Sequence, residues 1–267
     1  GNMHVITLMN AKGGVGKTML ATYLAVGLAA RGNRVLFLDS DAQANATNAF
    51  RLENAPDFHR LATSSVPWGE MMVSVSRDLL GETRGKLYVV RSNYDTCRID
   101  EQAGNVLHLR QRLQELDAAF QYCVIDTQPS MTPLHEAIFT ASDSVIIPTD
   151  CEAFSVQRGI PDTLARIQHL RQKAPMLMKD MANVLAIVPN KCRKLTAMHN
   201  RMLQKLREEY GGLVWEPIPL RAALTESQLK REFVYTAAPG LGITETMWKF
   251  VDQVMEKTSV RADSAPV

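Results

Sequence analysis

The glycine-rich stretch NAKGGVGKTML, residues 10–20, constrains the fold of this chain more than any other feature. It follows a short apolar run at 4–10 and precedes a segment with helical spacing that ends at Gly32. A second apolar run, residues 33–41, comes next and ends in two carboxylates. This strand–loop–helix–strand order predicts a βαβ unit, and such units build parallel sheets that helices cover on both faces.

The same alternation continues along the rest of the chain. Five more apolar segments predict strands, at residues 86–92, 122–128, 143–150, 183–191 and 213–219. Helical patterns lie at about 100–119, 132–141, 154–173, 195–210 and 242–257. We therefore expect an α/β fold: a doubly wound, mostly parallel, twisted sheet of about seven strands with helices on both faces. A single domain is expected over 1–257, with a flexible tail at 258–267, whereas the stretch 51–85 is too irregular to assign.

Composition narrows the class of protein. With 46% hydrophobic and 22% charged residues, the 267-residue chain matches an ordinary globular protein. No apolar run approaches the roughly 20 residues of a membrane span, and no secretion signal is visible. The four cysteines lie far apart without a C-x-x-C pair. This spacing argues against a zinc site or a disulfide framework and predicts a reducing, cytoplasmic environment.

The glycine loop predicts a phosphate site. Its glycines allow successive backbone N–H groups to turn toward phosphate oxygens, and the helix that follows adds its positive end. Lys17 is placed to bridge phosphates, and the Thr18 hydroxyl to ligate Mg²⁺. The residues expected to hold the phosphates are Gly13, Gly14, Val15, Gly16, Lys17, Thr18 and Met19. The loop departs from the usual pattern in two respects, since Ala11 replaces the first glycine and Lys12 adds a second cation.

Polar residues at other strand ends complete the predicted site, because ligands of open α/β sheets bind at the carboxyl ends of the strands. Asp39 and Asp41 end the second strand, and one can support a Mg²⁺-bound water while the other orients the attacking water. Asp126 closes a later apolar strand as a second anchor for the metal. Asn190 follows another strand and is suited to contact the edge of a base, although asparagine is also common in turns.

Four segments together resemble the ParA/MinD family of deviant Walker A ATPases, which are P-loop NTPases. They are KGGVGKT (12–18), DSDAQANAT (39–47), VIDTQPS (124–130) and ASDSVIIPTDCEAFSVQR (141–158). The resemblance implies that ATP and Mg²⁺ are the ligands and that Lys12 crosses a homodimer interface to the phosphates of the partner subunit. It also implies that Lys17 binds its own nucleotide, that Asp41 promotes hydrolysis, and that Asp39 and Asp126 support the metal.

Members of this family have different tasks. The pattern is closest to ParA-type partition ATPases without an N-terminal DNA-reading domain, because the first predicted strand begins by residue 4. The resemblance then implies ATP-dependent binding to non-specific DNA, slow hydrolysis stimulated by a ParB-like centromere-binding protein, and a cytoplasmic, nucleoid-associated location. The tail MEKTSVRADSAPV has no apolar face, which argues against a membrane-binding helix. An ATP-gated scaffold for a protein cargo, or a division-site regulator that does not act through DNA, remains the alternative.

Basic residues in the last third of the chain are the candidates for DNA contact. Between residues 191 and 231, Lys and Arg outnumber Asp and Glu. Their spacing matches no base-reading motif, so we expect contacts to the phosphate backbone without sequence choice. The candidates are Arg193, Lys194, Arg201, Lys205, Arg221, Lys230 and Arg231.

Overall fold

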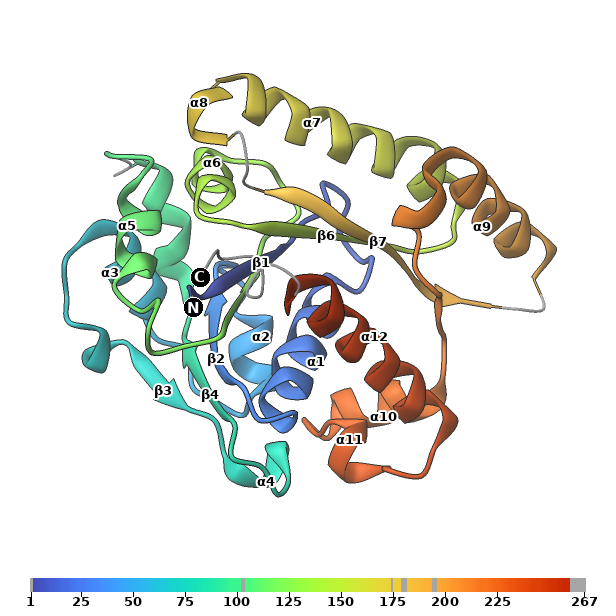
Figure 1. Cartoon of the computed structure of the whole chain (residues 1–267), viewed down its shortest axis with the longest axis horizontal. Coiled ribbons are helices and arrows are strands. Elements are labelled where there is room, and N and C mark those ends of the chain that lie inside the picture. The colour runs from blue at the N-terminus through green and yellow to red at the C-terminus, as the bar shows by residue number, and fades with distance from the viewer. Residues whose placement is uncertain (1, 102–103, 174, 179–181, 194–195, 260–267) are drawn as a thin grey trace, which may run out of the picture.

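The computed structural model describes residues 2–101, 104–173, 175–178, 182–193 and 196–259. Over these residues, eight strands form a sheet in the spatial order β3-β4-β2-β5-β1-β6-β7-β8 (Figure 1). The strands are β1 (His4–Leu8), β2 (Arg34–Asp39), β3 (Met72–Ser74), β4 (Lys86–Val90), β5 (Tyr122–Asp126), β6 (Ser144–Thr149), β7 (Asn183–Cys192) and β8 (Ile218–Pro219). All are parallel except β3, which pairs antiparallel with β4. The predicted mostly parallel α/β sheet is confirmed.

Alternation along β2 shows why the sheet carries helices on both faces. Val35 and Phe37 belong to one apolar cluster, and Leu36 and Leu38 belong to another. Successive side chains of a strand point to opposite faces, so an uninterrupted apolar run requires cover on each side.

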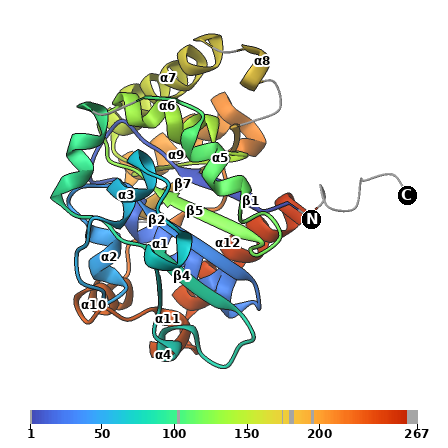
Figure 2. The same cartoon turned by 90° about the vertical axis from the view of Figure 1, so that its left-hand side faces the viewer.

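Helices supply that cover (Figures 1 and 2). Helices α1, α2, α4, α10, α11 and α12 contribute to the cluster on one face, and α3, α5, α6, α7 and α9 contribute to two clusters on the other. Their bounds are α1 (Lys17–Ala30), α2 (Asn45–Ala49), α3 (Asp57–Thr63), α4 (Arg77–Leu80), α5 (His108–Gln114), α6 (Pro133–Thr140), α7 (Ile160–Lys173), α8 (Pro175–Met178), α9 (Ala197–Tyr210), α10 (Ala222–Leu229), α11 (Val234–Ala237) and α12 (Gly242–Ser259). Short helical turns are η1 (Trp68–Glu70), η2 (Tyr94–Glu101), η3 (Ser155–Gly159) and η4 (Gly211–Leu213). Among the helices described, none is long and apolar enough to cross a membrane.

Several predicted boundaries are wrong. The irregular stretch 51–85 contains the edge strand β3, so the sheet has one strand more than expected. Of the helix expected at 100–119, residues 102–103 lie outside the described residues, and α5 is the α-helical part of the rest; before it, the Asn105 side chain accepts the backbone N–H of Leu107 (2.9 Å) and forms a turn. The strand expected at 213–219 shrinks to β8, because Pro219 within it and Pro217 just before it have no N–H to donate to a ladder.

The C-terminal boundary also differs slightly from the expected one. Helix α12 continues to Ser259, so the first two residues of the expected tail are helical. The rest of that tail, 260–267, lies outside the described residues.

The expectation that the cysteines are unpaired is wrong for two of them. A disulfide joins Cys151 and Cys192, whose Cα atoms lie 5.6 Å apart although 41 residues separate them in sequence. The two cysteines follow and end the neighbouring parallel strands β6 and β7, and this pairing brings them together. Cys97 and Cys123 are free. Sequence spacing could not show the disulfide, because it depends on which strands are adjacent.

Candidate functional site

The glycine loop connects β1 to α1, as predicted. Gly14 (φ 74°) and Gly16 (φ 83°) have left-handed backbone conformations, which residues with a Cβ rarely adopt. At Gly16 a Cβ would also lie 1.8 Å from Nδ2 of Asn190. Helix α1 begins at Lys17 and has no acidic residue in its first turn. Its positive end is therefore left without a carboxylate partner in that turn, as an anion site requires.

A buried polar network that the sequence analysis missed supports the start of this loop. The Asn10 side chain donates to the Pro148 carbonyl at the end of β6 (2.7 Å) and accepts the backbone N–H of Lys12 (2.8 Å). The Thr163 hydroxyl of α7 lies 3.3 Å from the Asn10 amide oxygen and accepts the Ala11 N–H (3.2 Å). Both side chains are buried, so they fix the loop against β6 and α7.

Lys17 lies in the interior of the cleft, with only 7% of its surface exposed. Burial lowers the pKa of its ammonium group, and the nearby carboxylates of Asp126 and Asp41 raise it. A cation that is buried beside carboxylates, at the start of a helix, is suited to bind a polyanion.

Asp126, at the end of β5, is the predicted metal anchor, and its geometry fits that role. Its Oδ2 accepts the Thr18 hydroxyl (2.7 Å), whereas its buried Oδ1 has no hydrogen-bond partner. Burial and the negative charge of Asp39 raise the pKa of Asp126 to about 7, against the opposing effects of Lys17 and the Thr18 hydroxyl. An unpartnered carboxylate oxygen next to a hydroxyl is a donor pair that suits a hard divalent cation.

The Thr18 hydroxyl and the Asp126 carboxylate are too few ligands for a metal ion that is bound by protein groups alone. Among the described residues, no group of three or more His, Cys, Asp or Glu could hold a metal ion. Mg²⁺ usually takes one or two protein ligands together with water and substrate phosphates. The Thr18–Asp126 pair therefore fits Mg²⁺ that arrives with a nucleotide.

Asp39 is the cross-strand neighbour of Asp126 in the pairing of β2 with β5. Burial raises the pKa of Asp39 to about 6, despite three hydrogen bonds. Its Oδ2 accepts the backbone N–H (2.9 Å) and the hydroxyl (2.6 Å) of Thr47, and its Oδ1 accepts the Asp41 N–H (3.2 Å). Both oxygens of Asp39 are thus occupied, and Asp126 keeps the free one. Thr47 was not foreseen, because it joins the site from α2.

Asp41 lies in the turn after β2 and lines the cleft, as expected. It is 9% exposed, and its Oδ1 accepts the Gln43 backbone N–H (3.0 Å). This bond holds the carboxylate near Lys17, while Asp39 holds the backbone of the turn.

Lys12 does not point to the phosphate loop of its own chain. Its ammonium lies 3.3 Å from Oδ2 of Asp150, donates to the Ser155 hydroxyl, and sits 5.7 Å from the centre of the Phe154 ring. The Lys12 side chain is 29% exposed and that of its neighbour Phe154 is largely exposed, so this lysine lies at the edge of the surface. The two lysines of the loop are held by different partners.

The opposite wall of the cleft comes from β7, β8 and α10, and the cleft has a volume of about 320 Å³. Asn190 is buried and donates to the Val15 carbonyl (3.3 Å), and Lys191 donates to the Gly14 carbonyl (3.0 Å). Met19 also lines the cleft. Residues of this wall that the sequence analysis missed are Pro219, Leu220, Leu224, Thr225 and Gln228. No motif marks them, because the wall forms only when β8 joins the sheet.

The seven basic candidates for DNA contact lie in different parts of the molecule. Arg201 and Lys205 are exposed on α9, and Arg193 is exposed before it. Lys194 lies outside the described residues. Lys230 and Arg231 follow α10, where an Arg231 guanidinium nitrogen lies 3.4 Å from the Asn48 amide oxygen.

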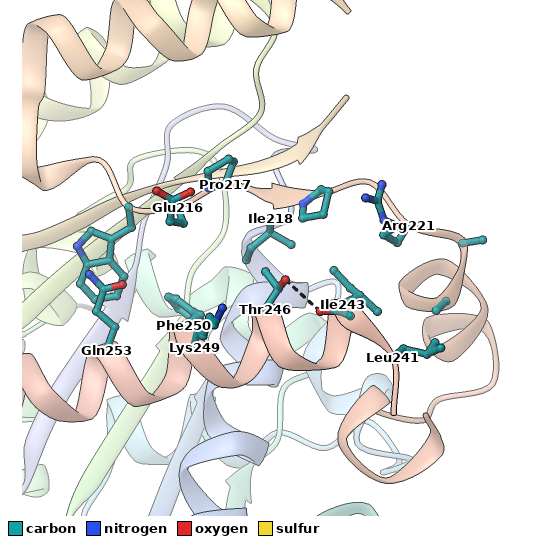
Figure 3. Close-up of a pocket in the computed structure, with 15 residues that line it drawn as sticks. Glu216, Pro217, Ile218, Arg221, Leu241, Ile243, Thr246, Lys249, Phe250 and Gln253 are labelled. Atoms are coloured by element: carbon teal, nitrogen blue, oxygen red, sulfur yellow. Dashed lines mark hydrogen bonds between the residues drawn. The ribbon is translucent and has the colours of Figure 1, made fainter. Parts of the chain in front are cut away.

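Arg221 lines the cleft itself and a second, larger cavity of about 770 Å³. Figure 3 shows this cavity between the β8 segment and α12, with Ile218, Ile243 and Phe250 in the apolar part and Arg221 at one end. The segment from Ile218 to α10 therefore separates the two hollows. Arg221 therefore lies beside the cleft, whereas Arg201 and Lys205 lie on α9.

The chain is similar to proteins of known families and structures. A family model described as an AAA domain matches residues 3–182. The chromosome partitioning protein ParA of Caulobacter vibrioides is 26% identical over 235 residues, which cover 84% of each chain. The chromosome-partitioning ATPase Soj of Thermus thermophilus is 26% identical over 260 residues, or 94% of this chain and 95% of that one.

A solved structure shows the same fold. The ATP complex of a single-residue variant of Cyanothece McdA superposes with a TM-score of 0.79 at 20% identity, over 96% of this chain and 97% of that chain. At this level of identity the likeness establishes the architecture alone.

Proposed function

The chain belongs to the ParA/MinD family and matches the AAA domain model, and we propose that it is a Mg-ATP-dependent, dimerising ATPase that partitions DNA. The observation that carries the proposal is the arrangement of buried Lys17 and Asp126 with the Thr18 hydroxyl below the glycine loop. The phosphates of ATP would supply the negative charge that pairs with Lys17, and Mg²⁺ the positive charge that pairs with the unpartnered Oδ1 of Asp126.

The residues of the cleft have separate roles in this proposal. Backbone N–H groups of residues 13–18 and the Lys17 ammonium bind the phosphates. Thr18 and the free oxygen of Asp126 would hold Mg²⁺, which would neutralise the charge of the bound phosphates. Asp39 keeps the turn after β2 in place, and Asp41 orients the attacking water.

Asn190 is proposed to contact the base. It lies against the glycine loop and lines the cleft, next to the apolar residues Pro219, Leu220 and Leu224. Its amide can both donate and accept, as the edge of an adenine requires.

Lys12 is proposed to leave its own subunit when ATP binds. Asp150 and Ser155 now satisfy its ammonium, and the phosphates bound by a second copy offer a stronger negative charge. The exchange makes ATP part of a two-fold interface, so hydrolysis weakens the dimer.

DNA binding is proposed to use the exposed cations outside the cleft, above all Arg201 and Lys205 on α9. Two subunits present twice as many phosphate contacts as one, so dimerisation couples ATP to DNA affinity. We expect a cytoplasmic, nucleoid-associated protein whose slow hydrolysis is stimulated by a ParB-like partner.

The test is binding to random-sequence duplex DNA over a range of salt concentrations, with no nucleotide, with ADP and with ATP. The Asp41→Ala variant, which should retain ATP, is measured beside the wild type. Binding that needs ATP, weakens with salt and persists longer in the variant supports the proposal. Absence of DNA binding in every state rejects it in favour of an ATP-gated scaffold for a protein cargo.

A further inference from the structure

The Cys151–Cys192 disulfide lies between the cleft and α9, outside the residues proposed to act on ATP. The sequence neighbours of each cysteine make hydrogen bonds or ion pairs to other parts of the chain. Asp150 precedes Cys151 and holds the Lys12 ammonium, and Lys191 precedes Cys192 and donates to the Gly14 carbonyl. The disulfide therefore joins the two segments that contact the glycine loop from β6 and from β7.

The residues that follow the two cysteines meet on a single histidine of α9. Glu152 follows Cys151, and its Oε1 lies 2.8 Å from Nε2 of His199. Arg193 follows Cys192, and its backbone N–H donates to Nδ1 of the same ring (3.0 Å). The disulfide thus also lies where the strand ends meet the helix that carries Arg201 and Lys205.

The far wall of the cleft is attached at the same point. Cys192 is paired with Pro219 in the register of β7 and β8, and its carbonyl accepts the backbone N–H of Leu220 (3.2 Å). Both Pro219 and Leu220 line the cleft. The disulfide therefore restrains three segments together. They are the turn at Asp150 that holds Lys12, the end of β7 at Lys191, and the cleft wall at Pro219 and Leu220.

From this position we propose that Cys151 and Cys192 form a redox-modification site that controls ATP-dependent dimerisation. The inference rests on the proposed function. In the disulfide form, the segment from Asp150 to Ser155 is tied to β7 and keeps Lys12 on its own subunit. In the dithiol form the segment is released, and Lys12 exchanges Asp150 for the phosphates of the partner.

The chemistry is thiol–disulfide exchange with a low-molecular-weight thiol. Two thiols RSH reduce the protein disulfide to Cys151–SH and Cys192–SH and are oxidised to RSSR, and the reverse reaction restores the bond. Cys192 is 6% exposed and Cys151 is fully buried, so the incoming thiolate attacks the Cys192 sulfur. Cys151 leaves as the thiolate and takes up a proton.

The test uses the full chain in a Cys97→Ser background, because Cys97 is exposed and could cross-link two molecules. One sample is treated with oxidised glutathione and another with dithiothreitol. Peptide mapping under non-reducing conditions establishes the Cys151–Cys192 bond. Binding of a fluorescent ATP analogue and the molar mass with Mg²⁺ and a non-hydrolysable ATP analogue are then measured in both samples.

We expect both forms to bind nucleotide and the reduced form to dimerise about tenfold more tightly, a coupling of ordinary size between two sites. The Cys151→Ser and Cys192→Ser variants should each lose the response to oxidised glutathione. Failure of the bond to form, equal dimerisation in the two forms, or a response that persists in both variants overturns the inference alone. Absence of nucleotide binding in both forms rejects the proposed function, and the inference with it.

Discussion

The floor of the cleft and its lip are built in different ways. The floor consists of the buried side chains of Lys17, Asp39 and Asp126 and the half-buried Thr18, which interact with one another through charges and hydrogen bonds. The lip consists of Lys12, Asn190, Lys191 and Arg221; Lys12 contacts the Asp150 carboxylate and the Ser155 hydroxyl, and the other three side chains donate to backbone carbonyls. Changing the floor leaves buried charges without partners, whereas the lip can exchange one contact for another. In the proposed function, the floor is preformed for Mg-ATP and the lip moves when it binds.

Lys17→Ala gives the largest expected effect. It removes the buried cation of the floor, so the affinity for ATP and the rate of hydrolysis should fall by about 100- to 1000-fold. Lys257→Ala, at an exposed position of α12, is the matched control and should change neither. ATPase assays and nucleotide titrations provide the measurement. Normal turnover by Lys17→Ala would show that the floor does not bind the phosphates.

Substitutions of basic residues separate the lip from the proposed DNA surface. The double change Arg201→Ala and Lys205→Ala should weaken DNA binding by about tenfold and lower the salt slope by about 2, with unchanged nucleotide affinity. Arg221→Ala should weaken nucleotide binding first, because this residue lines the cleft. Fluorescence anisotropy with labelled DNA and with a labelled nucleotide distinguishes the two. If the α9 variant alone loses nucleotide affinity, the assignment of the two regions is reversed.

Asp150→Asn tests whether the lip is held in its resting position. The change removes the charge that pairs with Lys12, so ATP-dependent dimerisation should strengthen by a few-fold. Lys173→Ala, which breaks a pair between exposed groups on α7 and α6, serves as the control. Sedimentation with a non-hydrolysable ATP analogue measures the change. Weaker dimerisation would mean that Asp150 belongs to the interface itself.

The pH dependence of stability gives the smallest expected effect and concerns the floor. The folded-state pKa of Asp126 is raised to about 7 and that of Asp39 to about 6, both above the ordinary value of 3.8. The folded state therefore binds more protons than the unfolded state in this range, and its stability should fall as pH rises from about 4 to about 7. Asp126→Asn should flatten this part of the profile of the free energy of unfolding. An unchanged slope in denaturant titrations would contradict the assigned charges.

The floor could largely be predicted from sequence, whereas of the lip the sequence analysis named Lys12 and Asn190 for the site and counted Arg221 among the DNA candidates. The glycine loop, Asp39 and Asp126 stand at strand ends, and parallel strands bring such ends to one edge of the sheet. Thr47 and Asn10 complete the buried network, but no sequence pattern indicates that Thr47 bonds to Asp39 or that Asn10 bonds to Pro148.

Contacts between strands that are distant in sequence explain the rest. The Cys151–Cys192 disulfide depends on the adjacency of β6 and β7, and the wall from Pro219 to Gln228 depends on β8 joining at the edge. Arg221 was counted among the DNA candidates because a count of charges along the sequence contains no information about where each side chain lies in the fold. Local sequence specified the chemistry of the floor, and strand order determined which residues surround it.

The most direct test of the central claim is the molar mass of the wild type and of Lys12→Ala with Mg²⁺ and a non-hydrolysable ATP analogue, measured by light scattering. The account predicts a dimer for the wild type and a monomer that still binds the nucleotide for Lys12→Ala. A wild type that remains monomeric, or a variant that dimerises equally well, would contradict it.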